Sequence, residues 1–202
     1  MPIAPLLWPS ISTPASEVVA LKDLYAHLVG LEYSAQAWEA ALFLYQTGRM
    51  PPPAIPRSVG RSWCFIAGRE CVMELFHLRA RLGKIRSVFL RKCPSIQQLI
   101  DAKKLRAASK RLDEYFPDIE LLRHAVAHTG ENEAHPETHA PGGRFALTSL
   151  TEDGRFALPY EGTLRQIAVS EASLQKIHIV LDEYFAAFNP AAELLRTQGH
   201  VD

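Results

Sequence analysis

The 202-residue chain has little of what would assign it quickly to a class of proteins. Its three cysteines, Cys64, Cys71 and Cys93, are an odd number without CxxC spacing, which argues against a disulfide framework and suits a reducing compartment. The formal net charge is +0, so bulk charge does not make the protein a binder of polyanions. The proline-broken N-terminus lacks a basic start, and no apolar run approaches membrane-spanning length. We therefore expect a soluble, cytoplasmic protein with no membrane contact.

Helical periodicity, in contrast, runs through most of the chain. Apolar residues recur every three or four positions, as they do on the buried face of an amphipathic helix. Thr13 and Pro14 are typical of a helix start, and Ser95 and Ser170 are typical caps. Asn189-Pro190 is expected to end the last helix and to leave a polar tail. The predicted helices cover approximately residues 13–47, 58–89, 96–115, 117–128 and 171–189.

A different pattern separates the fourth predicted helix from the last. Residues 130–143 combine glycine, proline and histidine, which favours a loop. Two short runs, 144–150 and 155–160, then flank Asp153-Gly154, which is a strong hairpin signal, and 163–169 can add a third strand. The phenylalanines of these runs, Phe145 and Phe156, suit either a partner contact or packing on the helices.

Together these patterns predict one mostly α-helical domain over residues 1–202. It would be a bundle of about five helices, by the count of periodic segments, with a loop and small β insertion at approximately 130–169 before the last helix.

The fourth predicted helix carries the chain's most distinctive cluster of polar residues. Pro117 and two acidic residues favour a helix start, and Gly130 favours a stop. Ile119, Leu122, Ala125 and Val126 fall on one face and predict burial. The C-terminal part of this segment reads Arg123-His124-Ala125-Val126-Ala127-His128.

This Arg-polar-x3-His string in a helical context resembles the signature of the HEPN family. The resemblance implies a HEPN-like helical bundle that is usually a homodimer. Many HEPN members are ribonucleases that need no metal or other cofactor, and many are toxins of bacterial defence systems held in check by an antitoxin. Other members have lost catalysis and only bind. The resemblance places Arg123 and His128 at the ancestral site.

The chemistry of these side chains agrees with such an activity. RNA carries its own nucleophile, the 2′-OH, so cleavage needs a proton carrier near neutral pH and a fixed cation for the charged phosphate. His128 suits the first role and Arg123 the second. His124 can orient the phosphate, hydrogen-bond its neighbour, or simply be an exposed polar residue. A two-fold dimer that joins two such helices would supply both an acid and a base, and a helix C-terminus favours protonated His128.

Positive charge is concentrated elsewhere in the sequence. The segment from Arg79 to Arg111 holds eleven Lys or Arg residues and one acid, Asp101, in a chain whose net charge is zero. Such a segment either forms a face that attracts RNA or pairs with acidic helices or an acidic partner. The residues predicted to contact nucleic acid are Lys103, Lys104, Arg106, Lys110 and Arg111.

Two alternatives to the ribonuclease remain. His124 and His128 have the helical spacing of paired zinc ligands, and His135 and His139 repeat that spacing, although there is no HExxH motif. This pattern suggests a histidine-based metal-binding protein. The other alternative is a non-catalytic module that binds a nucleic acid or a protein.

Overall fold

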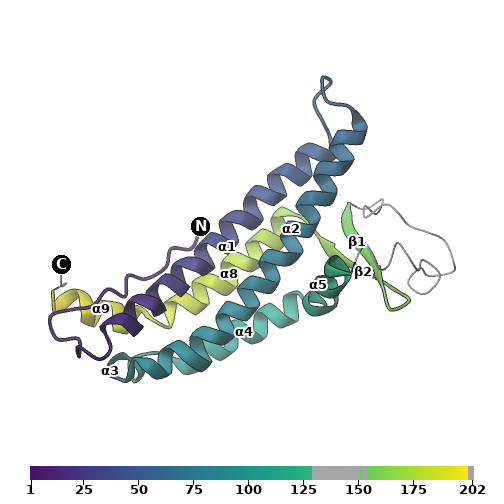
Figure 1. The fold of residues 1–202 in the computed structure, drawn as a ribbon. Helices are drawn as coiled ribbons and strands as arrows, with labels where there is room; N and C mark the ends of the chain where they lie inside the picture. Colours follow the sequence, from purple (N-terminus) through teal and green to yellow (C-terminus); the bar gives the residue numbers. More distant parts are fainter. Residues whose placement is uncertain (129–150, 152–153, 200–202) are drawn as a thin grey trace. The chain divides into compact units, whose positions relative to one another are not determined.

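The computed structural model describes residues 1–128, 151 and 154–199 (Figure 1). Its helices make up most of this part of the chain, and one two-stranded antiparallel sheet precedes the last helices. The predicted mostly α-helical class with a small β insertion is therefore confirmed. None of the helices in these ranges is long and apolar enough to cross a bilayer.

The chain forms two compact units, which we describe separately. The first unit contains Met1–Ala35, His77–Tyr115 and Gln175–Asp202, and the second contains Gln36–Phe76 and Phe116–Leu174. Three helices contribute residues to both units. They are α1 (Val18–Arg49), α2 (Arg57–Lys84) and α8 (Glu171–Ala186).

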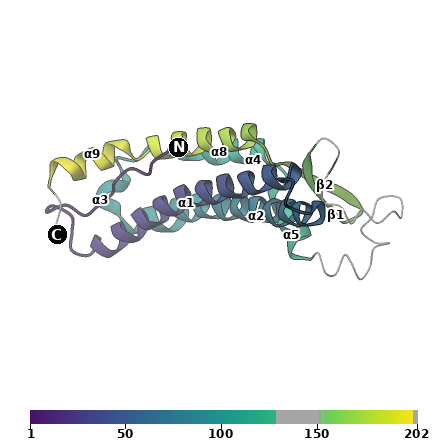
Figure 2. The same ribbon diagram turned by 90° about the horizontal axis from the view of Figure 1, so that it is seen from above.

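In the first unit, residues 1–17 precede the first helix, and most of the remaining described residues are helical. After α2, the chain continues as a π-helical turn, η1 (Ile85–Phe89), and a 3₁₀ turn, η2 (Leu90–Lys92). Helices α3 (Pro94–Gln97), α4 (Ala102–Tyr115) and α9 (Asn189–Thr197) complete the unit, and α4 lies beside α8 (Figures 1 and 2). The core is mainly leucine, with Tyr184 donating a hydrogen bond to the carbonyl of Leu82 at 3.0 Å. Burial raises the pKa of the Tyr184 hydroxyl.

Three predicted helix boundaries in the first unit are wrong, each for a visible reason. Thr13 Oγ1 accepts the Ser10 N–H at 2.8 Å instead of capping a helix, and α1 begins at Val18. Ser95 donates from both its N–H and its hydroxyl to Glu17 Oε2, at 3.1 and 2.6 Å. Asp101 Oδ1 accepts the N–H groups of the first turn of α4, so the predicted 96–115 helix is two helices.

The chain after the last predicted helix is also not a polar tail. Pro190 lies in the first turn of α9, where a missing N–H costs nothing, and Ala191 and Leu195 are buried. The proline that was expected to end helical structure therefore begins a new helix.

The second unit combines the end of α1 and the start of α2 with α5 (Ile119–Ala127) and a hairpin of β1 (Arg155–Tyr160) and β2 (Thr163–Ala168). The hairpin lies beside α5 (Figure 1). Tyr160 pairs with Thr163 across a two-residue turn, Glu161-Gly162, with φ of 47° and 69°. Positive φ at both positions matches the right-handed strand twist. The predicted strand at 163–169 is confirmed, whereas 144–150 lies outside the described residues.

Thr151 and Gly154, which flank the two undescribed residues of the turn predicted at Asp153-Gly154, are hydrogen-bonded as in a turn. Gly154 N–H donates to the Thr151 carbonyl at 2.9 Å, and Thr151 N–H donates to the Arg155 carbonyl at 3.0 Å. Gly154 has φ of 78°, a conformation that side-chain-bearing residues rarely adopt.

Phe156 fixes the hairpin to α2. Its ring is fully buried, with its centroid 6.0 Å from that of Phe65, and a Cβ on Gly68 would overlap it. The glycine therefore lets an aromatic ring lie directly on the helix backbone. Of the two interpretations for the hairpin phenylalanines, packing on the helices applies to Phe156. Phe145 lies outside the described residues.

Candidate functional site

The predicted amphipathic helix around the Arg-polar-x3-His string is confirmed as α5. Ile119, Leu122, Ala125 and Val126 are buried, as their spacing indicated. The helix ends at Ala127, and His128 is its C-cap, with its N–H donating to the His124 carbonyl at 3.0 Å. Gly130, the expected stop, lies outside the described residues. Cationic and titratable side chains thus occupy the last turn, where the helix dipole favours positive charge.

Arg123 is held by contacts on two sides. Its guanidinium carbon is 5.1 Å from the centroid of the Phe76 ring, and Nη1 is 3.4 Å from His124 Nδ1. A guanidinium over an aromatic face gains electrostatic attraction to the ring and loses little of its capacity to bind an anion. The side chain is half-buried, so its position is restricted before any ligand binds.

His124 lies between two other rings. Its centroid is 6.2 Å from that of His128, with 21° between the planes, and 6.1 Å from that of Tyr160, with 16° between the planes. His124 is half-buried, which does not agree with the interpretation as an exposed polar residue. We call Arg123, His124, His128 and Tyr160 the α5 site.

Two further arginines contact α5 from other elements. Arg69 of α2 donates through Nη2 to the carbonyl of Val126, in the last turn of α5, at 3.4 Å. Arg165 of β2 approaches Asp118, at the start of α5, with 3.6 Å between Nη1 and Oδ1. Its Nε is buried without a hydrogen-bond partner among the described residues. Three arginines from three elements therefore lie at α5: Arg69 of α2, Arg123 of α5 itself and Arg165 of β2.

Sequence reasoning missed Arg69, Tyr160 and Arg165, although the hairpin held a usable signal. Residues two apart on a strand share a face. Tyr160 is in register with buried Phe156 and Leu158, and Arg165 with buried Ile167. The alternation therefore assigns Tyr160 and Arg165 to the packed face. Which helix this face packs against is a tertiary fact that no local pattern contains.

The residues predicted to contact nucleic acid belong to a different unit. Lys103, Lys104, Arg106 and Lys110 are exposed on α4, whereas Arg111 is half-buried. Arg111 Nε lies 3.4 Å from Glu183 Oε2, and Lys110 Nζ lies 3.2 Å from Glu114 Oε1. Part of the predicted basic face is thus paired with acids inside the first unit. These residues lie in the first unit, and the α5 site lies in the second.

The cysteines are core residues, as predicted. All three are buried and free. Burial raises the pKa of Cys64 and Cys71, and burial together with Glu17 and Asp23 raises that of Cys93 to about 11. The thiols stay protonated near neutral pH, which leaves the α5 site as the better candidate for chemistry.

The predicted histidine metal site is only partly within the described residues. His135 and His139 lie outside them. Among residues 1–128, 151 and 154–199, no group of three or more His, Cys, Asp or Glu side chains is placed to hold a metal. Metal binding by all four histidines stays a prediction.

Comparison of the chain with protein-family models, curated protein sequences and solved structures finds no match.

Proposed function

We propose that the protein is a metal-independent endoribonuclease of HEPN type whose reaction takes place at the α5 site. One observation carries the proposal: a restricted guanidinium and two imidazoles lie together at one helix end. Arg123 Nη1 is 3.4 Å from His124 Nδ1, and the His124 ring stacks on that of His128. The resemblance of residues 123–128 to the HEPN signature supports the same assignment.

In the proposed reaction, the 2′-oxygen of RNA attacks the adjacent phosphorus and gives its proton to a base. The bond from phosphorus to the 5′-oxygen breaks, and that oxygen takes a proton from an acid. The products are a 2′,3′-cyclic phosphate and a 5′-hydroxyl end. His128 transfers protons and Arg123 stabilises the charge on the phosphate, which are the tasks imidazole and guanidinium suit best.

His124 has a more specific role in this proposal than its sequence position suggested. It touches Arg123 and stacks between His128 and Tyr160, so it orients the cation and can serve as the second proton carrier. One chain then holds both an acid and a base. A homodimer, as the resemblance implies, would double this set across its two-fold axis. Light scattering combined with activity at several protein concentrations separates the two arrangements.

Contact with RNA is supported by the solvent face of α4. Residues at intervals of three or four share one side of a helix, and Lys103, Arg106 and Lys110 follow this spacing while Leu105, Ala108 and Leu112 are buried opposite. Their charges would attract a phosphate backbone without reading its sequence. A toxin role, with an antitoxin protein as partner, follows from the resemblance and is part of this proposal.

The test is cleavage of a mixed RNA by the purified protein in EDTA. Wild type, Arg123→Ala and His128→Ala are compared, with Arg86→Ala and His77→Ala as controls, because both residues are exposed and belong to the first unit. We expect cleavage by wild type and both controls, and a loss of about 10²-fold or more in each α5 variant. Cleavage that needs added metal, or that survives in both α5 variants, would contradict the proposal.

RNA binding by the same samples addresses the alternative function. Binding without cleavage by wild type would favour a non-catalytic nucleic-acid module. In that case, Arg123→Ala is expected to weaken RNA binding and His128→Ala to change it little.

A further inference from the structure

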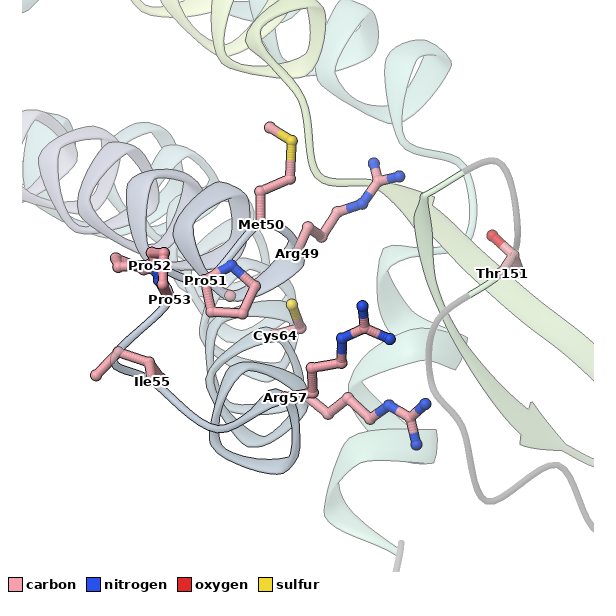
Figure 3. Close-up of a pocket in the computed structure, with 11 residues that line it drawn as sticks. Arg49, Met50, Pro51, Pro52, Pro53, Ile55, Arg57, Cys64 and Thr151 are labelled. Carbon is pink, nitrogen blue, oxygen red and sulfur yellow. The ribbon is translucent and has the colours of Figure 1, made fainter.

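A second cationic feature of the second unit lies where α1 ends and α2 begins. An open pocket of about 700 Å³ is lined there by Arg49, Arg57 and Arg61, with Thr151 at its edge (Figure 3). None of the described residues that line it is acidic. Arg57 and Arg61 are one helical turn apart, and such like-charge pairs are destabilising unless an anion neutralises them. The positive end of the α2 dipole adds to the same potential.

Close backbone packing gives this pocket a fixed floor. A Cβ on Gly48 would lie 2.5 Å from the carbonyl oxygen of Gly60, and one on Gly60 would lie 2.6 Å from that of Gly48. The end of α1 and the start of α2 therefore touch backbone to backbone. Buried Cys64 reinforces the contact, with Sγ donating to the Tyr45 carbonyl at 3.4 Å.

One of the three arginines is also positioned by the turn before β1. Tyr45 donates its hydroxyl hydrogen to the carbonyl of Gly154 at 3.0 Å, which ties this turn to α1. The guanidinium of Arg49 lies where a Cβ on Gly154 would be. Arg49 is therefore packed against a backbone that has no side chain to displace it.

The remaining lining is apolar. It consists of Met50, prolines 51–53 and Ile55. Figure 3 shows Arg49 and Arg57 extending toward the side of Thr151, with Pro52, Pro53 and Ile55 on the opposite side. A cationic side and an apolar side within about 700 Å³ fit a small amphipathic anion.

We propose that this pocket binds a nucleotide, with its phosphate on Arg49, Arg57 and Arg61 and its base against the wall of prolines. A guanidinium group can donate two parallel hydrogen bonds to two oxygens of one phosphate, and a flat base can cover the apolar wall. The proposal does not depend on ribonuclease activity, because it involves no residue of the α5 site. The nucleotide is either free or the 5′ end of an RNA strand, and the experiment below distinguishes these sources.

The experiment measures binding of 5′-AMP to the full chain by calorimetry, with inorganic phosphate and adenosine as partial ligands. The pocket variant R49Q/R57Q/R61Q is compared with R86Q/R91Q/K92Q, which removes the same charge from exposed positions in the first unit. We expect the pocket variant to bind AMP at least tenfold more weakly and the control to stay within twofold of wild type. Phosphate should bind more weakly than AMP, and adenosine should bind least.

A single substitution and hexanucleotides with different 5′ ends refine the test. Arg57→Lys keeps the charge but loses the paired geometry, so a several-fold weaker affinity is expected. A 5′-phosphorylated hexanucleotide that binds at least tenfold more tightly than both AMP and its 5′-hydroxyl counterpart assigns the pocket to an RNA end, whereas equal or weaker binding than AMP assigns it to a free nucleotide. Glu152 and Asp153 lie outside the described residues, and E152Q/D153N tests whether they compete with the ligand.

The outcome that overturns the proposal is specific to the pocket. It is the absence of AMP and hexanucleotide binding in both wild type and E152Q/D153N, or an equal loss in the two triple variants. Thermal unfolding of each variant shows whether it is folded. Because cleavage in EDTA is measured separately, failure here and failure of the ribonuclease proposal are distinguishable.

Discussion

Two sets of cations in this protein have the same charge but different surroundings. The side chains of Lys103, Lys104 and Arg106 on α4 are exposed to solvent. Arg69, Arg123 and Arg165 around α5 are half-buried, and each contacts an aromatic ring, a carbonyl oxygen or a carboxylate. Holding a cation in place before the ligand arrives is what stabilises a transition state, whereas solvated charge mainly raises affinity. The comparison agrees with the proposal that chemistry takes place at α5 and that α4 attracts RNA.

The largest expected effect comes from Gly68→Ala. This substitution disturbs the packing of the hairpin beside α5 and leaves the cations of α4 unchanged. The new methyl would overlap the Phe156 ring, so the hairpin that carries Tyr160 and Arg165 must shift. Overpacking of this kind destabilises by about 2–3 kcal/mol. Urea unfolding measures the loss, and RNA cleavage should fall while binding through α4 persists.

Gly83→Ala is the matched control for this change. Gly83 is also in α2, but a Cβ there meets nothing within 4 Å. Alanine should stabilise the helix by about 0.5–1 kcal/mol. Equal effects of the two substitutions would mean that Phe156 does not pack on Gly68 as described.

A smaller effect is expected from neutralising α4. K103Q/K104Q/R106Q removes three exposed charges, and each lost phosphate contact lowers the salt slope of single-strand binding by about 0.7. We expect RNA affinity to fall roughly tenfold at low salt. The slope of the logarithm of the binding constant against the logarithm of the salt concentration should become less negative by about two. An unchanged slope would show that α4 does not contact RNA.

Changes at Tyr160 sharpen the description of the α5 site. Tyr160→Phe keeps the ring that stacks on His124 and should leave cleavage within twofold of wild type. Tyr160→Leu removes the aromatic pair, which contributes about 0.5–1.5 kcal/mol, so cleavage should fall several-fold. An equal loss in both variants would show that the hydroxyl rather than the ring is the important group, and no loss in either would show that cleavage does not need Tyr160.

The smallest effect is expected at the Lys110–Glu114 pair. Both side chains are largely exposed, at 79% and 58%, so solvent screens their interaction. Glu114→Gln should therefore change the free energy of unfolding by no more than about 0.5 kcal/mol. Chemical denaturation measures this directly, and a loss above 1 kcal/mol would show that the pair is part of the packed structure.

Local patterns were sufficient for the features that depend on local physics. The buried face of α5 and the cap at Ser170, whose Oγ accepts the Ser173 N–H at 3.3 Å, both follow from residue spacing and short-range hydrogen bonds. The same reasoning placed Arg123, His124 and His128 at one helix end.

The features that the sequence did not reveal depend either on local hydrogen bonds that compete with the expected caps or on partners far along the chain. Helix α1 starts late because Thr13 bonds to Ser10, and Ser95 does not cap because Glu17 takes its hydrogen bonds. Asp101 was counted only as a lone acid, yet it caps α4. Arg69 joins α5 from a helix more than fifty positions earlier, through the carbonyl of Val126. The contacts of Glu17 with Ser95 and of Arg69 with Val126 arise only when the elements pack.

The central claim is that the cations around α5 act in catalysis and those of α4 in RNA attraction. Single-turnover cleavage in EDTA, measured across RNA concentrations, tests it most directly. Arg123→Gln should lower the saturating rate by about 10²-fold or more and change half-saturation little. K103Q/K104Q/R106Q should raise the half-saturating RNA concentration roughly tenfold and leave the saturating rate intact. Equal losses of saturating rate in both variants, or only a shift of half-saturation in Arg123→Gln, would contradict the account.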